Sequence, residues 1–480
     1  MAQGSESIVN ADGCPRFAEG LAKILPASPA AVLTLGDFPA ALGAILQDRG
    51  FALTHHLWRE IANQEHPSAG PAGELKQVKL EAPAGQPFEA VLALDLAGDI
   101  HPLAMFDGLN RLLSPGGVAV LSGPISVGSW LDYFTEIGER CGFVAVKHDI
   151  ALESSHFVHV LRRSTHPPRW RVGNVLPSDF AEIAKLFQDV FGHPMNRALW
   201  DWKYGSRRGN AVLARKDGVA VAHYGGMYRD ILVGGQLDRV AQICDVMVQS
   251  QERGVLTRQG PFFLMGSSWP EIYGPKGFGF PTTRAMRVAE KMGLYVEAGR
   301  LTEVRWTPSS PGIRLRTQVR TIDRSGKGDQ ELVRSLWASM SHDLQQGVVG
   351  VRDWAYLERR YFTHPSNPYE VLVVSSRFSG RPLGVVVLRK LEGSCELLDV
   401  IAPLANLATI IDQARRLTAR WGVPYLYCWI TTNYAPLFLQ CEGQEEPLDI
   451  SIPASSWTRN PQSELFVGKW WLMSGDTDFR

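Results

Sequence analysis

The chain has 480 residues, of which 45% are apolar and 20% are charged. This composition is ordinary for a globular protein, and the length predicts about three domains at roughly 100–200 residues each. The 49 basic and 49 acidic residues cancel. A nucleic-acid-binding protein should carry a basic excess or a basic block, so we expect no nucleic-acid partner.

The six cysteines are scattered along the chain and include no Cys-x-x-Cys pair. This spacing argues against a metal site and against a disulfide framework, and free thiols indicate a reducing compartment. No run of about 18 apolar residues occurs. Residues 1–20 also lack the apolar core of a signal peptide. We therefore expect a cytoplasmic protein without a membrane partner.

The first third of the chain alternates predicted strands and helices. Strands are expected at residues 31–36, 89–95 and 118–122, with helices at 40–46 and 101–113. Short apolar strands joined through helices are typical of a parallel sheet covered on both faces. The sequence therefore predicts an α/β fold that opens with a Rossmann-like, doubly wound domain over residues 1–165.

Residues 88–124 resemble the class I S-adenosylmethionine methyltransferase fold. The resemblance rests on the strand that ends at Asp95, on His101-Pro102, and on Leu-Leu-Ser-Pro-Gly-Gly before a strand. Active members of that family place a Gly-x-Gly loop after the first strand, whereas this chain has one glycine followed by Phe38. We therefore expect a retained fold that does not bind S-adenosylmethionine; a working methyltransferase is the alternative. The adjacent His55 and His56 would face opposite sides of a strand, which disfavours a metal site.

A Pro-rich linker at residues 166–170 and a Pro- and Gly-containing stretch between 306 and 328 divide the rest of the chain. The two segments that they delimit, 170–312 and 318–480, resemble each other. In each, an aromatic-rich helix ends in a basic residue followed by Tyr204 or Tyr361, and a predicted hairpin follows. We interpret this as a domain-sized duplication; chance similarity is the alternative.

A long predicted strand at residues 239–249 runs directly into the loop 250–254. A short helix is expected from about Val255 to Gly260, and a further strand at 262–265. A strand, a tight loop and a helix N-terminus together form a general anion-binding device, since main-chain N–H groups converge on a phosphate.

This order of elements resembles the GNAT superfamily of acyl-CoA-dependent transferases. Its loop pattern, Gln/Arg-x-x-Gly-x-Gly/Ala, matches at Gln251 and Gly254 and departs at Leu256. Tyr273-x-x-x-Gly277-Phe278 resembles a second family motif, with Pro275 as a departure. The resemblance implies two GNAT-type mixed α/β folds in tandem after the Rossmann-like domain. The second copy lacks the loop, and we expect it to be structural.

The resemblance also implies a cofactor, acetyl-CoA or another acyl-CoA. Its pantetheine arm would pair with the main chain near the end of the long strand, and its pyrophosphate would lie over the loop. The cofactor-binding residues expected on this basis are Met247, Val248, Gln251, Arg253, Gly254, Val255, Leu256 and Thr257.

The implied reaction is the attack of a neutral amine on a thioester, with a carboxylate to accept the proton and a tyrosine to protonate the leaving thiolate. Asp245 and Glu271 are the candidate bases, Tyr273 is the first candidate donor, and Tyr224 and Tyr228 follow. Each has an ordinary structural alternative. Asp245 could hold a loop N–H group, Glu271 could favour a helix dipole, and Tyr273 could be a packing aromatic.

The sequence therefore favours an N-acyltransferase that acts on an amine of a small molecule, a sugar or a biosynthetic intermediate. The alternatives are a non-catalytic scaffold built from degenerate folds, a bifunctional enzyme that also methylates, and a peptide-directed acyltransferase. A homo-oligomer or a complex with other biosynthetic proteins stays open. The paired tryptophans Trp200/Trp202 and Trp470/Trp471 are expected at domain seams, with sugar binding as the alternative.

Overall fold

The computed structural model describes residues 14–36, 38–56, 59–67, 74–79, 87–94, 96, 100–124, 133–148, 150, 156–205, 208–255, 257–309, 316–458 and 461–479. The chain folds as two compact units, each assembled from separated segments. Residues 1–195, 209–225 and 245–274 form the first unit, and residues 196–208, 226–244 and 275–480 form the second. The boundaries inferred near residues 165–170 and 312–318 stay predictions. No described helix is long and apolar enough to cross a membrane.

The first unit contains a six-stranded sheet in the order β2-β1-β5-β6-β8-β7. Strands β2, β1, β5 and β6 are parallel, and β8 is antiparallel to both β6 and β7. The strands are β1 Ala31–Leu35, β2 Ala52–His56, β5 Phe88–Ala93, β6 Leu113–Pro124, β7 Phe143–Ala145 and β8 His156–Arg163. The strands and helices expected in this region are confirmed within one to five residues at their ends. Asp95 lies outside the described residues, and the methyltransferase resemblance stays a prediction. A separate hairpin pairs β3 Arg59–Pro67 with β4 Glu74–Lys79.

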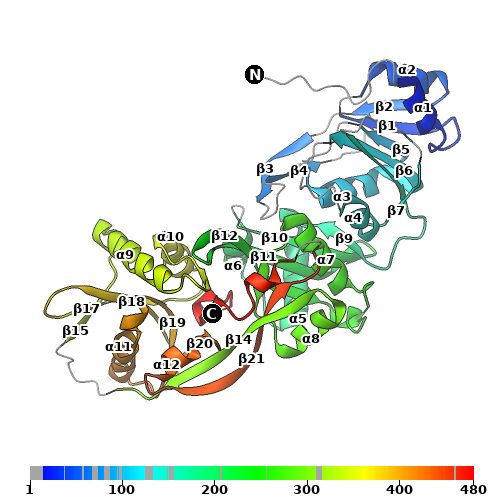
Figure 1. Cartoon of the computed structure of the whole chain (residues 1–480). Coiled ribbons are helices and arrows are strands. Elements are labelled where there is room, and N and C mark those ends of the chain that lie inside the picture. The colour runs from blue at the N-terminus through cyan, green and yellow to red at the C-terminus, as the bar shows by residue number, and fades with distance from the viewer. Residues whose placement is uncertain are drawn as a thin grey trace. The chain divides into compact units, whose positions relative to one another are not determined.

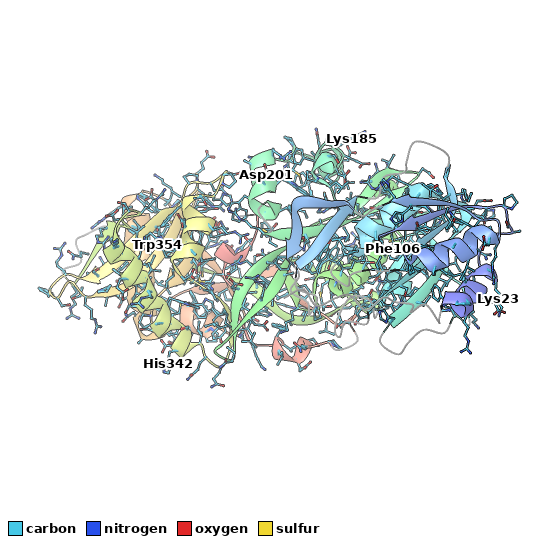
Figure 2. All side chains as sticks on the ribbon, turned by 90° about the horizontal axis from the view of Figure 1, so that it is seen from above. Lys23, Phe106, Lys185, Asp201, His342 and Trp354 are labelled. Atoms are coloured by element: carbon cyan, nitrogen blue, oxygen red, sulfur yellow. The ribbon has the colours of Figure 1, made fainter. Side chains whose placement is uncertain are left out.

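Helices cover both faces of this sheet (Figure 1). Helices α1 Cys14–Ala22 and α2 Ala40–Asp48 pack on one face, where Phe17 and Leu42 join the core of β1 and β5. Helices α3 Pro102–Leu112 and α4 Phe134–Arg140 cover the other. Phe106, labelled in Figure 2, is fully buried and meets Phe134 and Phe143 at ring-centroid distances of 5.0 and 5.4 Å. This arrangement agrees with the alternation of apolar strands and helices in the sequence.

A second layer of the first unit carries the strands that follow the Pro-rich linker. Strand β9 Arg171–Asn174 pairs antiparallel with β10 Gly209–Lys216. The turn into β11 Val219–Val233 has positive φ angles at Asp217 and Gly218, as a two-residue hairpin turn requires. Helix α5 Phe180–Phe191 precedes this hairpin. Asp107 of α3 accepts a hydrogen bond from the main-chain N–H of Asn174 (2.9 Å), which joins α3 to β9.

Helix α7 corrects the sequence prediction for the region after the loop. We predicted a helix from Val255 to Gly260 and a strand at 262–265; instead a single helix runs from Pro261 to Tyr273, and 257–260 form a turn. Nearly every residue of α7 is buried. A helix that is apolar all round shows no 3.6-residue period, so its apolar run can be taken for a buried strand. Proline also suits the first helical position, which moves the helix start to Pro261.

The second unit contains a seven-stranded sheet in the order β15-β17-β18-β19-β20-β14-β21. Strand β14, which we predicted as part of the first copy, lies between β20 and β21 and pairs antiparallel with both. The strands are β14 Tyr295–Trp306, β15 Thr317–Thr321, β17 Glu370–Ser376, β18 Pro382–Lys390, β19 Cys395–Ile401, β20 Leu426–Thr431 and β21 Gln444–Ser455. The helices are α6 Arg197–Tyr204, α8 Thr283–Met292, α9 Lys327–Asp343, α10 Trp354–Leu357, α11 Leu407–Arg420 and α12 Ala435–Leu439. Ile410, Ile411, Ala414 and Leu417 of α11, whose spacing in the sequence predicts one apolar helix face, are buried.

Strands β19 and β20 are parallel but pair only at their beginnings, through Cys395 with Leu426 and Glu396 with Tyr427. Beyond these pairs the C-terminal segment, residues 470–479, enters between them. Thr431 at the end of β20 donates its hydroxyl to the Trp470 carbonyl (2.5 Å). A Cβ atom at Gly475 would lie 2.7 Å from the Leu398 carbonyl oxygen of β19. The end of the chain therefore fills the space between β19 and β20.

The C-terminal segment also pairs as a strand. Strand β22 Trp470–Trp471 lies parallel to β16 Val348–Gly350, and β16 pairs antiparallel with residues 231–233 of β11. Trp470 and Trp471 are buried, and Trp470 stacks on Phe466 at 5.4 Å. This tryptophan pair is thus part of the core, and its expected place at a domain seam stays a prediction.

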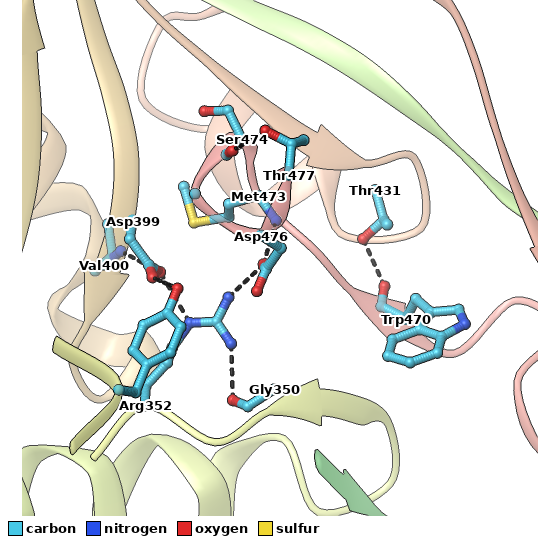
Figure 3. Close-up of polar contacts among 12 residues, drawn as sticks. Gly350, Arg352, Asp399, Val400, Thr431, Trp470, Met473, Ser474, Asp476 and Thr477 are labelled. Atoms are coloured by element: carbon cyan, nitrogen blue, oxygen red, sulfur yellow. Dashed lines mark hydrogen bonds and ion pairs between the residues drawn. The ribbon is translucent and has the colours of Figure 1, made fainter. Parts of the chain in front are cut away.

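Arg352 is fully buried at the centre of the second unit (Figure 3). Its guanidinium donates to Asp399 of β19 (2.8 Å), to Asp476 of the C-terminal segment (2.6 Å) and to the Gly350 carbonyl (2.8 Å). The hydroxyls of Tyr356 and Tyr361 also donate to Asp399. Burial favours the neutral form, but the two carboxylates outweigh it and raise the pKa of Arg352.

Replacing Asp399 by asparagine should lower the free energy of unfolding by about 3–5 kcal/mol, because Arg352 would stay buried with half of its countercharge removed. Urea-induced unfolding followed by tryptophan fluorescence measures this change. The same substitution at Asp189, which is exposed on α5, should change it by less than about 0.5 kcal/mol. Equal losses for the two variants would contradict the role of Arg352.

Candidate functional site

The predicted site lies at the end of the strand β12 Gln236–Val248. On one side β12 pairs parallel with β13 Gly277–Gly279, but only over residues 241–243. On the other side it stays with β11 to its end, because the Gln249 N–H donates to the Val221 carbonyl (2.8 Å). Residues 244–248 thus extend beyond the ladder with β13.

Asp245 has a φ angle of 50°, which interrupts the regular strand. Aspartate tolerates this left-handed region better than most residues, and a strand interrupted in this way bends. The fully buried His223 of β11 donates from Nδ1 to the Asp245 carbonyl (2.7 Å) and holds the bend. Met247 is buried and Val248 is half-buried just beyond it. Sequence reasoning missed His223, since nothing in the local pattern marks a bend.

The loop after β12 begins with a 3-10 turn, η3 Ser250–Glu252. Gly254 has a φ angle of 91°, a conformation in which a side chain is strained, and no other atom lies within 4 Å of a Cβ built there. Gly254 is therefore required for its backbone conformation. Thr257 accepts a hydrogen bond from the Gly260 N–H (3.0 Å), which turns the chain into Pro261, the first residue of α7.

Other predicted loop residues have local contacts. Gln251 is exposed and accepts a hydrogen bond from the Ser250 hydroxyl (3.0 Å). Arg253 donates from Nε to the Val248 carbonyl (2.7 Å), a main-chain acceptor that the resemblance assigns to the pantetheine arm. A cofactor arm that used this carbonyl would have to displace Arg253. Val255 lies directly before Leu256, which falls outside the described residues.

Glu252 anchors the loop and was not predicted. Its side chain is buried and accepts hydrogen bonds from Lys216 of β10 (2.7 Å), from Arg169 (2.8 Å) and from the Trp170 indole (3.0 Å). The hydrogen bond from Lys216, with those from the linker residues, lowers the pKa of Glu252 against the opposing effect of burial. The loop is thus fastened both to β10 and to the Pro-rich linker.

Glu271 lies in the last turn of α7, so the alternative that it stabilises the dipole at a helix start is wrong. It forms a buried ion pair with Arg140 at the end of α4 (2.5 Å between Nη1 and Oε2), and Arg140 also donates to Ser268 (3.3 Å). Charge-assisted hydrogen bonds of this kind fix the carboxylate in place. This contact links α7 to the N-terminal α/β layer.

Tyr273 is the last residue of α7 and is buried. Its hydroxyl lies 2.7 Å from Nε2 of His101, the N-cap residue of α3. The His101 Nδ1 atom accepts from the Ala104 N–H (3.3 Å), so in the neutral ring Nε2 carries the proton and donates to Tyr273. A proline after His101 is typical of a helix start. The contact between His101 and Tyr273, in contrast, arises from the tertiary fold.

An aromatic row continues from Tyr273 to Tyr224 of β11. Trp269 lies between them, with ring centroids 5.2 Å from Tyr273 and 6.4 Å from Tyr224. The Trp269 indole donates to the Asn210 carbonyl of β10 (3.3 Å). The structure thus brings Asp245, Tyr224, Glu271, Tyr273 and the loop into one unit, while Tyr228 belongs to the other.

Replacing Glu252 by glutamine should lower the free energy of unfolding at pH 7 by about 1–3 kcal/mol, because two cations lose a buried charged partner. Because the pKa of Glu252 is lowered in the folded protein, the ionised side chain stabilises the fold at pH values above the ordinary pKa of 4.5. This stabilisation is lost as the pH falls below 4.5. The difference between wild type and variant should therefore be constant from pH 7 to about 5 and shrink in more acidic buffer. Urea unfolding across this range tests it, with the exposed Glu392→Gln as control; a difference that grows on acidification would refute the assignment.

Comparison with known proteins finds one family match: residues 171–260 match the family described as Acetyltransferase (GNAT) domain. No curated protein matches the chain. Among solved structures, the chain is similar to a probable N-acyltransferase of Enterococcus faecalis V583 (12% identity, 59% of this chain and 71% of the other, TM-score 0.46). It is also similar to a GCN5-related N-acetyltransferase of Anabaena variabilis (13% identity, 59% and 72%, TM-score 0.46) and to N-myristoyltransferase of Saccharomyces cerevisiae (11% identity, 59% and 79%, TM-score 0.40). The matched residues end just before Pro261 of α7 and include the bent strand and its glycine loop. Residues 171–260 are therefore similar to the GNAT acetyltransferase domain.

Proposed function

We propose that this protein is an N-acyltransferase that moves an acyl group from acetyl-CoA or another acyl-CoA to an amine of a small molecule. One observation carries the proposal. Within the matched segment, β12 bends at Asp245, runs beyond its ladder with β13, and continues into a loop that needs glycine at position 254. A bent strand end exposes main-chain groups to an extended ligand, and a glycine loop lets a phosphate approach the backbone.

The cofactor's arm would lie along Met247 and Val248, and its pyrophosphate over the backbone from Arg253 to Thr257. Three features support the loop as a preformed element: the conformation of Gly254, the anchor at Glu252, and the turn that Thr257 closes before α7. A rigid loop binds a phosphate with little loss of conformational freedom.

Acyl transfer needs a base that takes a proton from the attacking amine and an acid that protonates the departing thiolate. Of the candidates, Asp245 and Tyr224 are favoured. Asp245 lies at the strand bend, and Tyr224 is next to His223 on the neighbouring strand. The contacts of Glu271 with Arg140 and of Tyr273 with His101 favour structural roles for that pair.

A non-catalytic binding protein is the second candidate. The hydrogen bond from Arg253 to the Val248 carbonyl and the leucine at position 256 support it, because both compete with tight cofactor packing. A scaffold should bind neither acetyl-CoA nor S-adenosylmethionine, and a bifunctional enzyme should bind both.

Thermal unfolding of the whole chain with each cofactor separates these candidates. Acetyl-CoA at about 100 times its dissociation constant should stabilise the protein by about 2.7 kcal/mol, and S-adenosylmethionine should not. Gly254→Val should abolish the shift, because a side chain is strained at that φ angle and would obstruct the phosphate. Gly192→Val is the matched control, since Gly192 also has a positive φ and no neighbour within 4 Å. No shift with acetyl-CoA would reject the transferase and favour the scaffold.

Steady-state kinetics with an amine substrate test the choice of base. Asp245→Asn should lower kcat by about 10²–10⁴-fold and leave the fold intact, since asparagine also tolerates a positive φ. Glu271→Gln should mainly lower stability, by about 1–3 kcal/mol, because Arg140 loses its charged partner. The reverse pattern, with kcat lost in Glu271→Gln and kept in Asp245→Asn, would exchange the two roles.

A further inference from the structure

The second unit contains a pocket of about 260 Å³ that the proposed acyl transfer does not use. It is formed by the end of α6, by the second half of β11, by β12 and by the segment around α10. Its lining residues are Trp202, Arg208, Met227, Tyr228, Arg229, Asp230, Arg239, Val351, Asp353, Ala355, Tyr356, Arg359 and Arg360. Five arginines and two aspartates face one small cavity, so its positive charge exceeds its negative charge.

The two aspartates of the lining are already engaged. Asp230 pairs with Arg239 (2.9 Å), and Asp353 caps α10 by accepting the Tyr356 N–H (2.8 Å). Arg229 pairs with Asp476 (3.1 Å), a carboxylate that Arg352 shares. Arg229 and Arg239 therefore each have a carboxylate partner within the protein.

Arg208 and Arg359 have no ion pair within the described parts of the chain. Both are half-buried. Burial, together with the positive charges of Arg229 and Arg208, lowers the pKa of Arg359 to about 10. Arg359 is therefore still a cation at neutral pH, in surroundings that disfavour its charge, and an anion would relieve this repulsion.

The fold holds Arg359 and its neighbour Arg360 in place. Arg359 lies on a π-helical turn, Glu358–Phe362, a rare element that is frequent at functional sites. The Trp202 indole donates to the Arg359 carbonyl (2.9 Å), and the Arg359 guanidinium lies 5.7 Å from the Trp202 ring centroid. The next residue, Arg360, donates to the carbonyls of Gly475 and Thr477 and to the Tyr369 hydroxyl.

We propose that this pocket binds the carboxylate or phosphate group of a small molecule, with Arg208 and Arg359 as the residues that contact the oxyanion. A guanidinium presents a planar fork of N–H donors that matches either oxyanion. The pocket's size suits a small metabolite, and Trp202 and Tyr228 offer aromatic surface for its uncharged part. This inference goes beyond the proposed acyl transfer and does not depend on it.

The test is calorimetric titration of the full chain with inorganic phosphate and, separately, citrate, in low-chloride buffer without acyl-CoA. Binding with a dissociation constant below about 1 mM to at least one of them is expected. Arg359→Gln and Arg208→Gln should each weaken it by about tenfold or more, because one charge-assisted contact is lost. The relative affinities for the two probes distinguish a phosphate ligand from a carboxylate ligand.

The exposed Arg377→Gln, which removes the same charge elsewhere, should bind as the wild type does. The weakening caused by Arg359→Gln should also be seen when it is introduced into the Gly254→Val variant, which separates this pocket from the proposed cofactor loop. Arg359→Lys, which keeps the charge, should bind more tightly than Arg359→Gln and guards against misfolding. No binding of either probe, or equal weakening in Arg377→Gln, would overturn the proposal.

Discussion

The second unit depends on the buried charge of Arg352. A guanidinium without access to water is tolerated only when carboxylates surround it, and here Asp399 and Asp476 do so from two segments far apart in the sequence. Because Asp476 is also paired with Arg229, the same group connects β11, the start of α10, β19 and the end of the chain. Well-packed apolar groups in place of a buried ion pair often give a protein of equal stability. The particular effect of these charges is therefore to specify one arrangement of these four elements.

The same arrangement places the C-terminal segment between β19 and β20. Strands β19 and β20 pair at only two positions and then diverge. The opening in the second copy is filled by residues 470–479, with Gly475 packed against Leu398 and Asp399 where no side chain would fit. The sequence after β19 also lacks a Gln/Arg-x-x-Gly loop, which agrees with the prediction that residues 318–480 have a structural role.

The N-terminal α/β layer contributes to the candidate site through α7. His101 and Arg140, at the beginning of α3 and the end of α4, contact Tyr273 and Glu271. Two residues that look catalytic from their motif thus have partners that position a buried helix. Asp245, by contrast, owes its place to a bend in β12 that His223 of the neighbouring strand holds.

The sequence by itself determined the alternating strands and helices between residues 31 and 122, the hairpin at residues 211–225, the core face of α11 and the glycine loop, because these depend on local periodicity and turn chemistry. It was wrong at α7, where a helix buried on all sides carries no periodic signal. Only the tertiary structure decided that β14 joins the second sheet, that Glu252 is a buried anchor, and that Glu271 and Tyr273 face α4 and α3. It also decided that Arg208 and Arg359 line one pocket. Such pairings join residues tens to hundreds of positions apart. No local pattern in the sequence encodes which distant residue will pair with a buried charged side chain.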